Sequence, residues 1–346
     1  MDEEKAITFL ESSFLRKLLL EDGVTDISFN GTHLFYQHNY LGRVQSDIEV
    51  EKTQVIDFLR QLSNLCEKKF SIQEPILDLT VGKYRLNAIH PCIGRKGHMK
   101  VPTFALRIAS ETLKAKEDKF FLPNKVISLL EDILDNNCSV VIGGITGTGK
   151  TELQKFLISL MKDSTRVIVI DNVLELDSLL IESNIDLNVW QYDDQKENIS
   201  IPTLVRNALR SNPDWLIVAE SRGEEMRDVL NSALTGHPII TTLHAKSIET
   251  MPSRIVSMVM MGDKKTSYRD VRFDVYSHFK VYVFLKKHID NGIVTRYINQ
   301  IGFISNTGEQ EIVYVNDGTK AEYRPFSEQL LNSIPFKQKT IESWCA

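Results

Sequence analysis

The sequence has few cysteines, no surplus of positive charge and no long apolar run, and each shortage excludes a class of protein. Its four cysteines stand singly without a C-x-x-C pair, so neither a disulfide framework nor a zinc site is expected. A net charge of −5 offers no overall attraction to nucleic acid, and no direct readout of nucleic acid is predicted. Apolar runs such as VYVFL (281–285) are far shorter than the roughly 18 residues of a membrane-spanning helix.

The first residues also lack the basic character of a secretory signal. MDEEKAITFL begins with acidic side chains, so we expect a cytoplasmic chain whose membrane contact is peripheral and made through partner proteins. With 346 residues the chain is long enough for two domains of ordinary size. Hydrophobic residues at 42% and charged residues at 25% are the balance of a soluble globular protein.

Residues 1–110 predict an N-terminal α+β domain. Apolar residues at helical spacing run through residues 3–22, and Gly23 is expected to end that helix. Residues 26–38 alternate around an Asn-Gly pair, which indicates a β-hairpin. One further helix and three short strands complete the domain, at residues 51–68 for the helix and 76–81, 83–90 and 103–109 for the strands. The charged connector at residues 111–122 is the expected linker.

Residues 123–346 predict a second domain of the α/β class. Apolar strands such as SVVIGG, RVIVID, DWLIVAE and IITTLHA alternate with helical segments, which predicts a mostly parallel sheet with helices on its faces. After residue 275 the pattern changes to alternating strands, with an Asn-Gly turn at 291–292 and a loop at 306–308. These strands predict a C-terminal antiparallel extension of the sheet.

The segment GGITGTGKT (143–151) contains the full pattern G-x-x-x-x-G-K-[ST] between an apolar strand and a helical segment. In this pattern glycines let backbone N–H groups converge on phosphate oxygens at a helix N-terminus. The lysine reaches the β- and γ-phosphates, and the hydroxyl takes a position on Mg²⁺. An ordinary glycine-rich turn is the alternative. Pattern and context together favour a nucleoside triphosphate, bound by Gly144, Ile145, Thr146, Gly147, Thr148, Gly149, Lys150 and Thr151.

Polar residues at the ends of three other apolar strands complete a candidate catalytic site. Asp171 and then Glu175 follow RVIVI, Glu220 follows DWLIVA, and His244 follows IITTL. Because catalytic groups lie at the carboxyl ends of strands in open α/β sheets, these side chains should meet beside the loop. Glu220 could bind Mg²⁺ together with Thr151 or orient the attacking water, and His244 could sense the γ-phosphate. Singly, such acids are often helix caps and a lone histidine is usually structural, so the convergence carries the hypothesis.

These motifs resemble those of the secretion ATPases, the motors of type II and type IV secretion, conjugation, and type IV or Flp-type pilus assembly. IDNVLEL (170–176) is similar to the family's aspartate box, and LRSNPDWLIVAESR (209–222) to its magnesium-binding segment. TGHP (235–238) and TTLHA (241–245) resemble its T-G-H and histidine boxes. The resemblance extends into the first domain, through DISFNG (26–31), KYRLNAIHP (83–91) and TFALRIAS (103–110).

The resemblance implies a RecA-like P-loop domain that hydrolyses ATP with Mg²⁺, in a homo-hexamer at the inner face of the cell membrane. Its implied partners are membrane-embedded platform proteins of a secretion or pilus machine. The catalytic residues that it implies are Lys150, Asp171, Glu175, Glu220 and His244. Arg85 and Arg107 would contact the terminal phosphates from the first domain, since guanidinium groups pair with phosphate oxygens. Arg206 and Arg210, one helical turn apart, are weaker candidates for a subunit contact.

Two features indicate which branch of the family the chain resembles most. It has no tetracysteine metal module and its first domain is short, as in the type IV secretion and Flp/Tad branch. It also departs from the family at Asp171, where a glutamate is usual, and at Asn172, where an aspartate is usual. Since catalytic geometry is sensitive to shifts of about 1 Å, the shorter carboxylate favours a rival hypothesis, a nucleotide-gated scaffold with little turnover. A P-loop kinase for a small acceptor is disfavoured because no lid or acceptor segment is evident.

Overall fold

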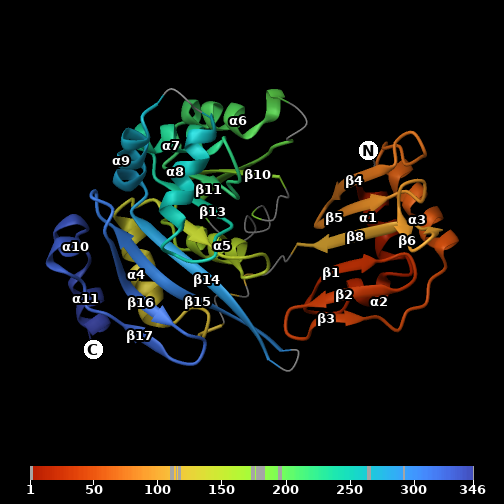
Figure 1. Cartoon of the computed structure of the whole chain (residues 1–346), viewed down its shortest axis with the longest axis horizontal. Coiled ribbons are helices and arrows are strands. Elements are labelled where there is room, and N and C mark those ends of the chain that lie inside the picture. The colour runs from red at the N-terminus through yellow and green to blue at the C-terminus, as the bar shows by residue number, and fades with distance from the viewer. Residues whose placement is uncertain are drawn as a thin grey trace. The chain divides into compact units, whose positions relative to one another are not determined.

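The computed structural model describes residues 3–109, 113, 115, 118–172, 176, 184–193, 197–262, 266–290 and 293–345. The chain divides into two compact units, Met1–Glu111 with Ile289–Thr295, and Thr112–His288 with Arg296–Ala346. Each unit is a β-sheet with helices packed on it (Figure 1). Within the described ranges, no helix is both long and apolar enough to span a bilayer.

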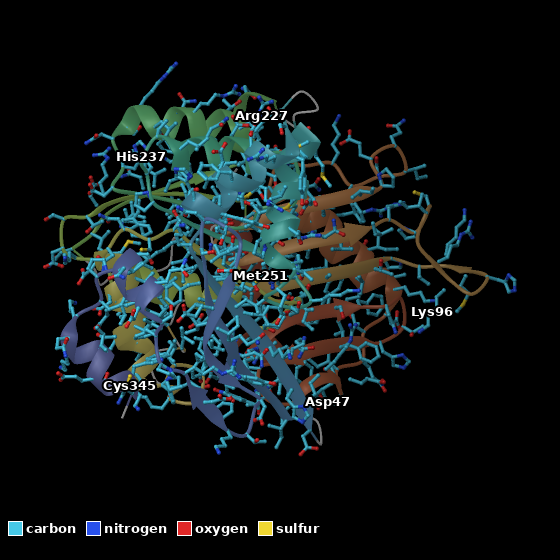
Figure 2. All side chains as sticks on the ribbon, turned by 60° about the vertical axis from the view of Figure 1, so that its left-hand side comes forward. Asp47, Lys96, Arg227, His237, Met251 and Cys345 are labelled. Carbon is cyan, nitrogen blue, oxygen red and sulfur yellow. The ribbon has the colours of Figure 1, made fainter. Side chains whose placement is uncertain are left out.

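The first unit is built on a six-stranded antiparallel sheet with the order β3-β2-β1-β8-β5-β4. Its strands are β1 (Val24–Phe29), β2 (Leu34–His38), β3 (Gly42–Gln45), β4 (Ile76–Val81), β5 (Tyr84–Ile89) and β8 (Thr103–Ile108). Its helices are α1 (Glu3–Glu11), α2 (Arg16–Leu19) and α3 (Lys52–Leu65). A separate hairpin of β6 (Arg95–Lys96) and β7 (Met99–Lys100) projects from the unit, with Lys96 labelled in Figure 2.

Alternating apolar residues give this sheet one buried face. Ile27, Leu79, Leu86 and Leu106 share a core with apolar residues of the three helices, and each is at most 4% exposed. Side chains at the intervening positions face away from that core, as the period of two requires. The hairpin expected at residues 26–38 is present as β1 and β2, which pair antiparallel.

The single helix predicted for residues 3–22 is wrong, because the structure has two helices there. The break lies at Ser13, whose Oγ donates to the carbonyl of Leu10 at 2.7 Å and accepts from the N–H of Leu15 at 3.2 Å. A serine hydroxyl that bonds to the backbone competes with the helical hydrogen bonds, so α1 ends before α2 begins. The spacing of apolar residues carries no information about this competition.

The second unit contains a nine-stranded sheet with the order β11-β10-β12-β13-β9-β14-β15-β16-β17. Parallel pairing joins the first six of these strands, and antiparallel pairing joins the last three. The strands are β9 (Val140–Gly143), β10 (Arg166–Asp171), β11 (Asp186–Gln191), β12 (Trp215–Val218), β13 (Ile239–Leu243), β14 (Val281–Asp290), β15 (Ile293–Ile304), β16 (Gln310–Asn316) and β17 (Ala321–Tyr323).

Helices cover both faces of this sheet. One core joins it to α4 (Asn124–Asp135), α5 (Lys150–Ser159), α10 (Glu328–Ser333) and α11 (Gln338–Cys345). The other joins it to α6 (Ile201–Ala208), α7 (Met226–Leu234), α8 (Met251–Gly262) and α9 (Tyr268–His278). Along β12, Ile217 belongs to the first core and Val218 to the second, which is the alternation expected of a strand buried on both faces.

The predicted fold class is confirmed, with one difference in the C-terminal extension. The strand Val281–Asp290 was expected to begin an antiparallel extension, but β14 pairs in parallel with β9. Antiparallel pairs join β15 to β16 and β16 to β17, as expected of the extension. Strand direction depends on which neighbour a strand joins, and alternation of apolar residues cannot reveal that neighbour.

Candidate nucleotide-binding site

The glycine-rich segment forms the turn between β9 and α5. Gly147 and Gly149 have φ angles of 76° and 94°, in the left-handed region that residues with a Cβ rarely adopt. At Gly144 a Cβ would lie 2.6 Å from Oγ1 of Thr148 and 2.8 Å from the carbonyl oxygen of Leu285. The backbone is therefore compact in a way that only glycine permits.

The basic and hydroxyl residues of the loop lie at the N-terminus of α5. Lys150 and Thr151 are its first two residues, where backbone N–H groups lack partners within the helix. Nζ of Lys150 donates to the carbonyls of Gly144 and Ile145, at 3.2 and 3.3 Å. Oγ1 of Thr148, a fully buried residue, also donates to Ile145, at 2.9 Å. Backbone N–H groups and an ammonium at one helix end are the elements of an anion-binding arrangement.

The sheet order brings two of the predicted acids, Asp171 and Glu220, and the predicted histidine to the edge from which the loop leaves. In that order β10, β12, β13 and β9 are consecutive and parallel, so their carboxyl ends coincide. Asp171 is the last residue of β10 and is 3% exposed. Glu220 stands two positions after β12, and His244 directly follows β13. Asp171, Glu220 and His244 thus line one edge beside the phosphate-binding motif.

Glu220 lies between two basic side chains, Arg222 and His244. Burial raises its pKa, but a 2.6 Å hydrogen bond from Arg222 and the charges of Arg222, His244 and Lys150 outweigh that effect and leave the pKa below its usual value. Nε2 of His244 lies 2.8 Å from Oε1 of Glu220. Among the described residues Oε1 has no aligned hydrogen bond, although it is buried. Glu220 is therefore an ionised acceptor between two basic side chains, with Arg222 at one oxygen and His244 at the other.

Buried hydroxyl groups fix the backbone on both sides of Glu220. Thr242 Oγ1 donates to the carbonyl of Ala219 at 2.7 Å, and its own carbonyl accepts from the N–H of Ser221 at 2.8 Å. Ser221 Oγ and Thr241 Oγ1 lie 2.9 Å apart and share a hydrogen bond. Because these bonds join the end of β12 to β13, the positions of Glu220 and His244 depend on each other.

The aspartate-box segment, residues 170–176, lies only partly within the described residues. Asp171 pairs with Gln191 in the sheet. The side-chain amide of Gln191 donates to the backbone oxygen of the neighbouring Asn172 at 3.1 Å. Glu175 lies outside the described residues. Its catalytic role stays a prediction.

The two candidate arginines of the first unit are neighbours. Arg85 on β5 and Arg107 on β8 are directly paired across the antiparallel ladder. Each lies near one carboxylate, Arg85 at 3.8 Å from Asp78 and Arg107 at 3.9 Å from Asp26. Their contact with phosphates bound by the second unit stays a prediction.

Sequence reasoning missed three basic residues that touch this site. Arg222 was within the magnesium-binding motif, and its spacing of two residues from Glu220 was the available signal. Lys287 donates to the carbonyl of Thr146 at 3.0 Å, and Arg296 to that of Gly147 at 2.9 Å. These two lie on β14 and β15, more than 130 residues after the loop, and no local pattern marks them.

Comparison with known proteins identifies the family. The family model described as "Type II/IV secretion system protein" matches residues 99–271, which is half of the chain. The chain belongs to this family. The resemblance to the secretion ATPases that the motifs indicated is therefore confirmed.

Individual relatives agree with this assignment. The Brucella suis type IV secretion system protein VirB11 is 32% identical over 178 residues, 49% of this chain and 48% of that protein. An uncharacterised Bacillus anthracis protein, pXO2-25, is 29% identical over 255 residues, 72% of this chain and 56% of that protein. The chain thus spans about half the length of the curated relatives it matches. The solved ATPase DotB of Legionella pneumophila shares the fold, with a TM-score of 0.61 and 22% identity over 100% of this chain and 87% of DotB.

Proposed function

We propose that this chain is an ATPase subunit of a type IV secretion, conjugation or Flp-type pilus machine. The observation that carries the proposal is the meeting of the glycine-rich loop with Asp171, Glu220 and His244 at one sheet edge. A loop that binds phosphates and acids that act on water are the two parts that phosphoryl transfer to water requires. Membership of the family adds the type of machine.

The residues of the loop would bind the triphosphate. Lys150 now donates to two carbonyls of its own loop, and phosphate oxygens would compete for the same ammonium. A charged acceptor makes a shorter and stronger hydrogen bond than a carbonyl, so the exchange favours the bound state. The backbone amides of residues 144–151 would complete the contacts.

The oxygen ligands suit Mg²⁺. The hydroxyl of Thr151 and the ionised carboxylate of Glu220 are the hard donors that this ion prefers, with phosphate oxygens and waters supplying the remainder. When bound, the ion would neutralise phosphate charge. Glu220 would otherwise accept a hydrogen bond from the attacking water. Its position is held by the bonds of its neighbours Ala219 and Ser221 to β13 and by Arg222.

The rival proposal is a scaffold that binds ATP and hardly hydrolyses it. It is favoured by Asp171, whose carboxylate is one methylene shorter than the family's glutamate and is 3% exposed at the end of β10. A short, fixed carboxylate leaves a lytic water poorly aligned if it is the main base. If Glu220 is the main base instead, aspartate in place of glutamate at position 171 lowers turnover little.

Steady-state phosphate release from the full chain decides between the two. The enzyme proposal predicts turnover that falls about a hundredfold or more in Lys150→Ala and in Glu220→Gln, since each loses a charged contact to the reacting groups. Glu220→Gln keeps the shape of the side chain and should still bind ATP. Wild-type release no faster than that of both variants, with ATP still bound, would instead establish the scaffold.

The proposal extends to assembly and place. The subunits would form a homo-hexamer that sits at the inner face of the membrane and acts on membrane-embedded platform proteins. Hydrolysis would release Arg85 and Arg107 from the terminal phosphate, so the first unit would respond to the nucleotide state. Support for this part comes from family membership.

A further inference from the structure

Two basic side chains from the C-terminal strands hold consecutive carbonyls of the phosphate-binding loop. Nζ of Lys287, on β14, donates to the oxygen of Thr146 at 3.0 Å. Nε of Arg296, on the adjacent strand β15, donates to the oxygen of Gly147 at 2.9 Å. Both side chains are partly buried, so water screens these contacts less than it would on an open surface. Neither contact involves an atom that would itself perform the reaction.

The geometry of the peptide bond gives these contacts a consequence. In a planar trans peptide the C=O and the N–H point in opposite directions. The oxygen of Thr146 shares its peptide with the N–H of Gly147, and the oxygen of Gly147 shares its peptide with the N–H of Thr148. A donor that fixes one of these oxygens therefore turns the N–H of the same peptide away from that donor. Those amides belong to the segment expected to bind phosphate.

Gly147 shows how closely Lys287 approaches the loop. With φ at 76°, this residue has a backbone that glycine tolerates best. A Cβ built on it would lie 3.1 Å from Nζ of Lys287. Apart from the residues next to it in the chain, no other described atom would lie within 4 Å of that Cβ. The ammonium thus occupies the space beside the glycine. It brings a positive charge next to a loop that must hold several negative ones.

We propose that Lys287 and Arg296 are positioning residues for the nucleotide, which orient the amides of Gly147 and Thr148 and add two positive charges behind them. The proposal rests on the proposed function, because it concerns how the same loop binds a nucleoside di- or triphosphate. Each contact polarises its peptide and strengthens the N–H on the other side. The two side chains act on neighbouring peptides, so their effects should be coupled.

The test is calorimetric titration of the full chain with ATP and with ADP, each with MgCl₂. Lys287→Met and Arg296→Met remove the donors while keeping the length of the side chain. Each should weaken binding of both nucleotides about tenfold, the effect of one charge-assisted hydrogen bond. The double variant should weaken it by less than about a hundredfold because the effects are coupled. Arg296→Lys, which keeps the charge, should recover part of the loss.

Lys286→Met is the matched control. Lys286 is the preceding residue of β14, and its Nζ lies 6.0 Å from the centre of the Phe284 ring. The Lys286→Met variant loses the same charge from the same strand and should change nucleotide affinity less than about twofold. Equal weakening by Lys286→Met, or wild-type affinity in both Lys287→Met and Arg296→Met, would overturn the inference. A wild-type chain that binds neither nucleotide would instead remove the proposed function, so the two failures are distinguishable.

Discussion

At Gly149 the lack of a side chain satisfies two separate requirements. Its φ of 94° is in the left-handed region, and a Cβ would lie 3.3 Å from two ring carbons of Phe121. Gly236 has the same φ of 94° and no described atom within 4 Å of a Cβ. The two positions therefore share the backbone strain and differ in the steric contact.

Gly149→Ala should lower the free energy of unfolding more than Gly236→Ala does. Both variants strain the backbone at a cost of about 1–3 kcal/mol, and only the first also displaces the Phe121 ring. Urea denaturation measures both, and binding of ATP should weaken in Gly149→Ala alone. Equal losses in the two variants would mean that the Phe121 contact contributes nothing.

Thr242→Val tests the coupling between Glu220 and β13. The change removes a buried hydroxyl that donates to Ala219 at 2.7 Å and leaves that carbonyl unsatisfied, at a cost of about 1–3 kcal/mol. Because the backbone beside Glu220 loosens, kcat for ATP should fall while affinity for ATP stays near wild type. Thr250→Val, at an exposed threonine, is the control and should change neither. A parallel loss of affinity would contradict a role confined to Glu220.

At the scale of elements, an ion-pair network joins α4 to the start of α11. Asp132, 1% exposed, accepts from the backbone N–H of Lys337 at 2.8 Å. Nζ of Lys337 lies 2.7 Å from Asp135, which also pairs with Lys162 at 2.8 Å. The hydrogen bonds from Lys162 and Lys337 hold the pKa of Asp135 below its ordinary value of 3.8.

This network predicts an acid-dependent part of the stability. A carboxyl group whose pKa is lower in the folded chain stabilises it above the unfolded pKa, and that contribution is lost as the pH falls through the folded pKa. Asp135→Asn should therefore cost at most about 1 kcal/mol at pH 6 and less at pH 3, since the pair is largely solvent-exposed. Urea titrations at several pH values measure this. A cost that grows as the pH falls would contradict the assignment.

The same scale shows what the sequence could predict. The alternation of strands and helices after residue 123 predicted a parallel sheet, because short apolar strands separated by helices are compatible with few other folds. The break at Ser13 was missed because a hydroxyl bond is invisible to apolar spacing. The parallel pairing of β14 with β9 was missed because it joins strands about 140 residues apart.

Whether a site residue could be predicted depended on how far along the chain it lies from the loop and on whether a local pattern marks it. Lys150 and Thr151 could be proposed as site residues because their chemistry requires fixed spacing within one loop. Asp171, Glu220 and His244 were found because the ends of parallel strands coincide. Lys287 and Arg296 were not, because their contacts depend on the register of strands that local patterns do not determine. Long-range polar contacts of this kind need the folded structure.

At the scale of the whole molecule, the chain consists of two compact units. The second unit carries the loop and the acids, and the first carries Arg85 and Arg107 on paired strands. Family membership supports the proposal that the chain acts in a type II/IV secretion system. Every part of that account requires that the loop at residues 144–151 bind a nucleotide.

Equilibrium binding of ATP with MgCl₂ to the folded full chain tests that requirement most directly. Calorimetry should detect one site per chain, and Lys150→Ala should weaken it by about two orders of magnitude, because the ammonium is lost from the phosphates. Circular dichroism would show that both proteins are folded. A folded wild-type chain that takes up no adenine nucleotide, or a Lys150→Ala variant that binds as tightly, would contradict the account.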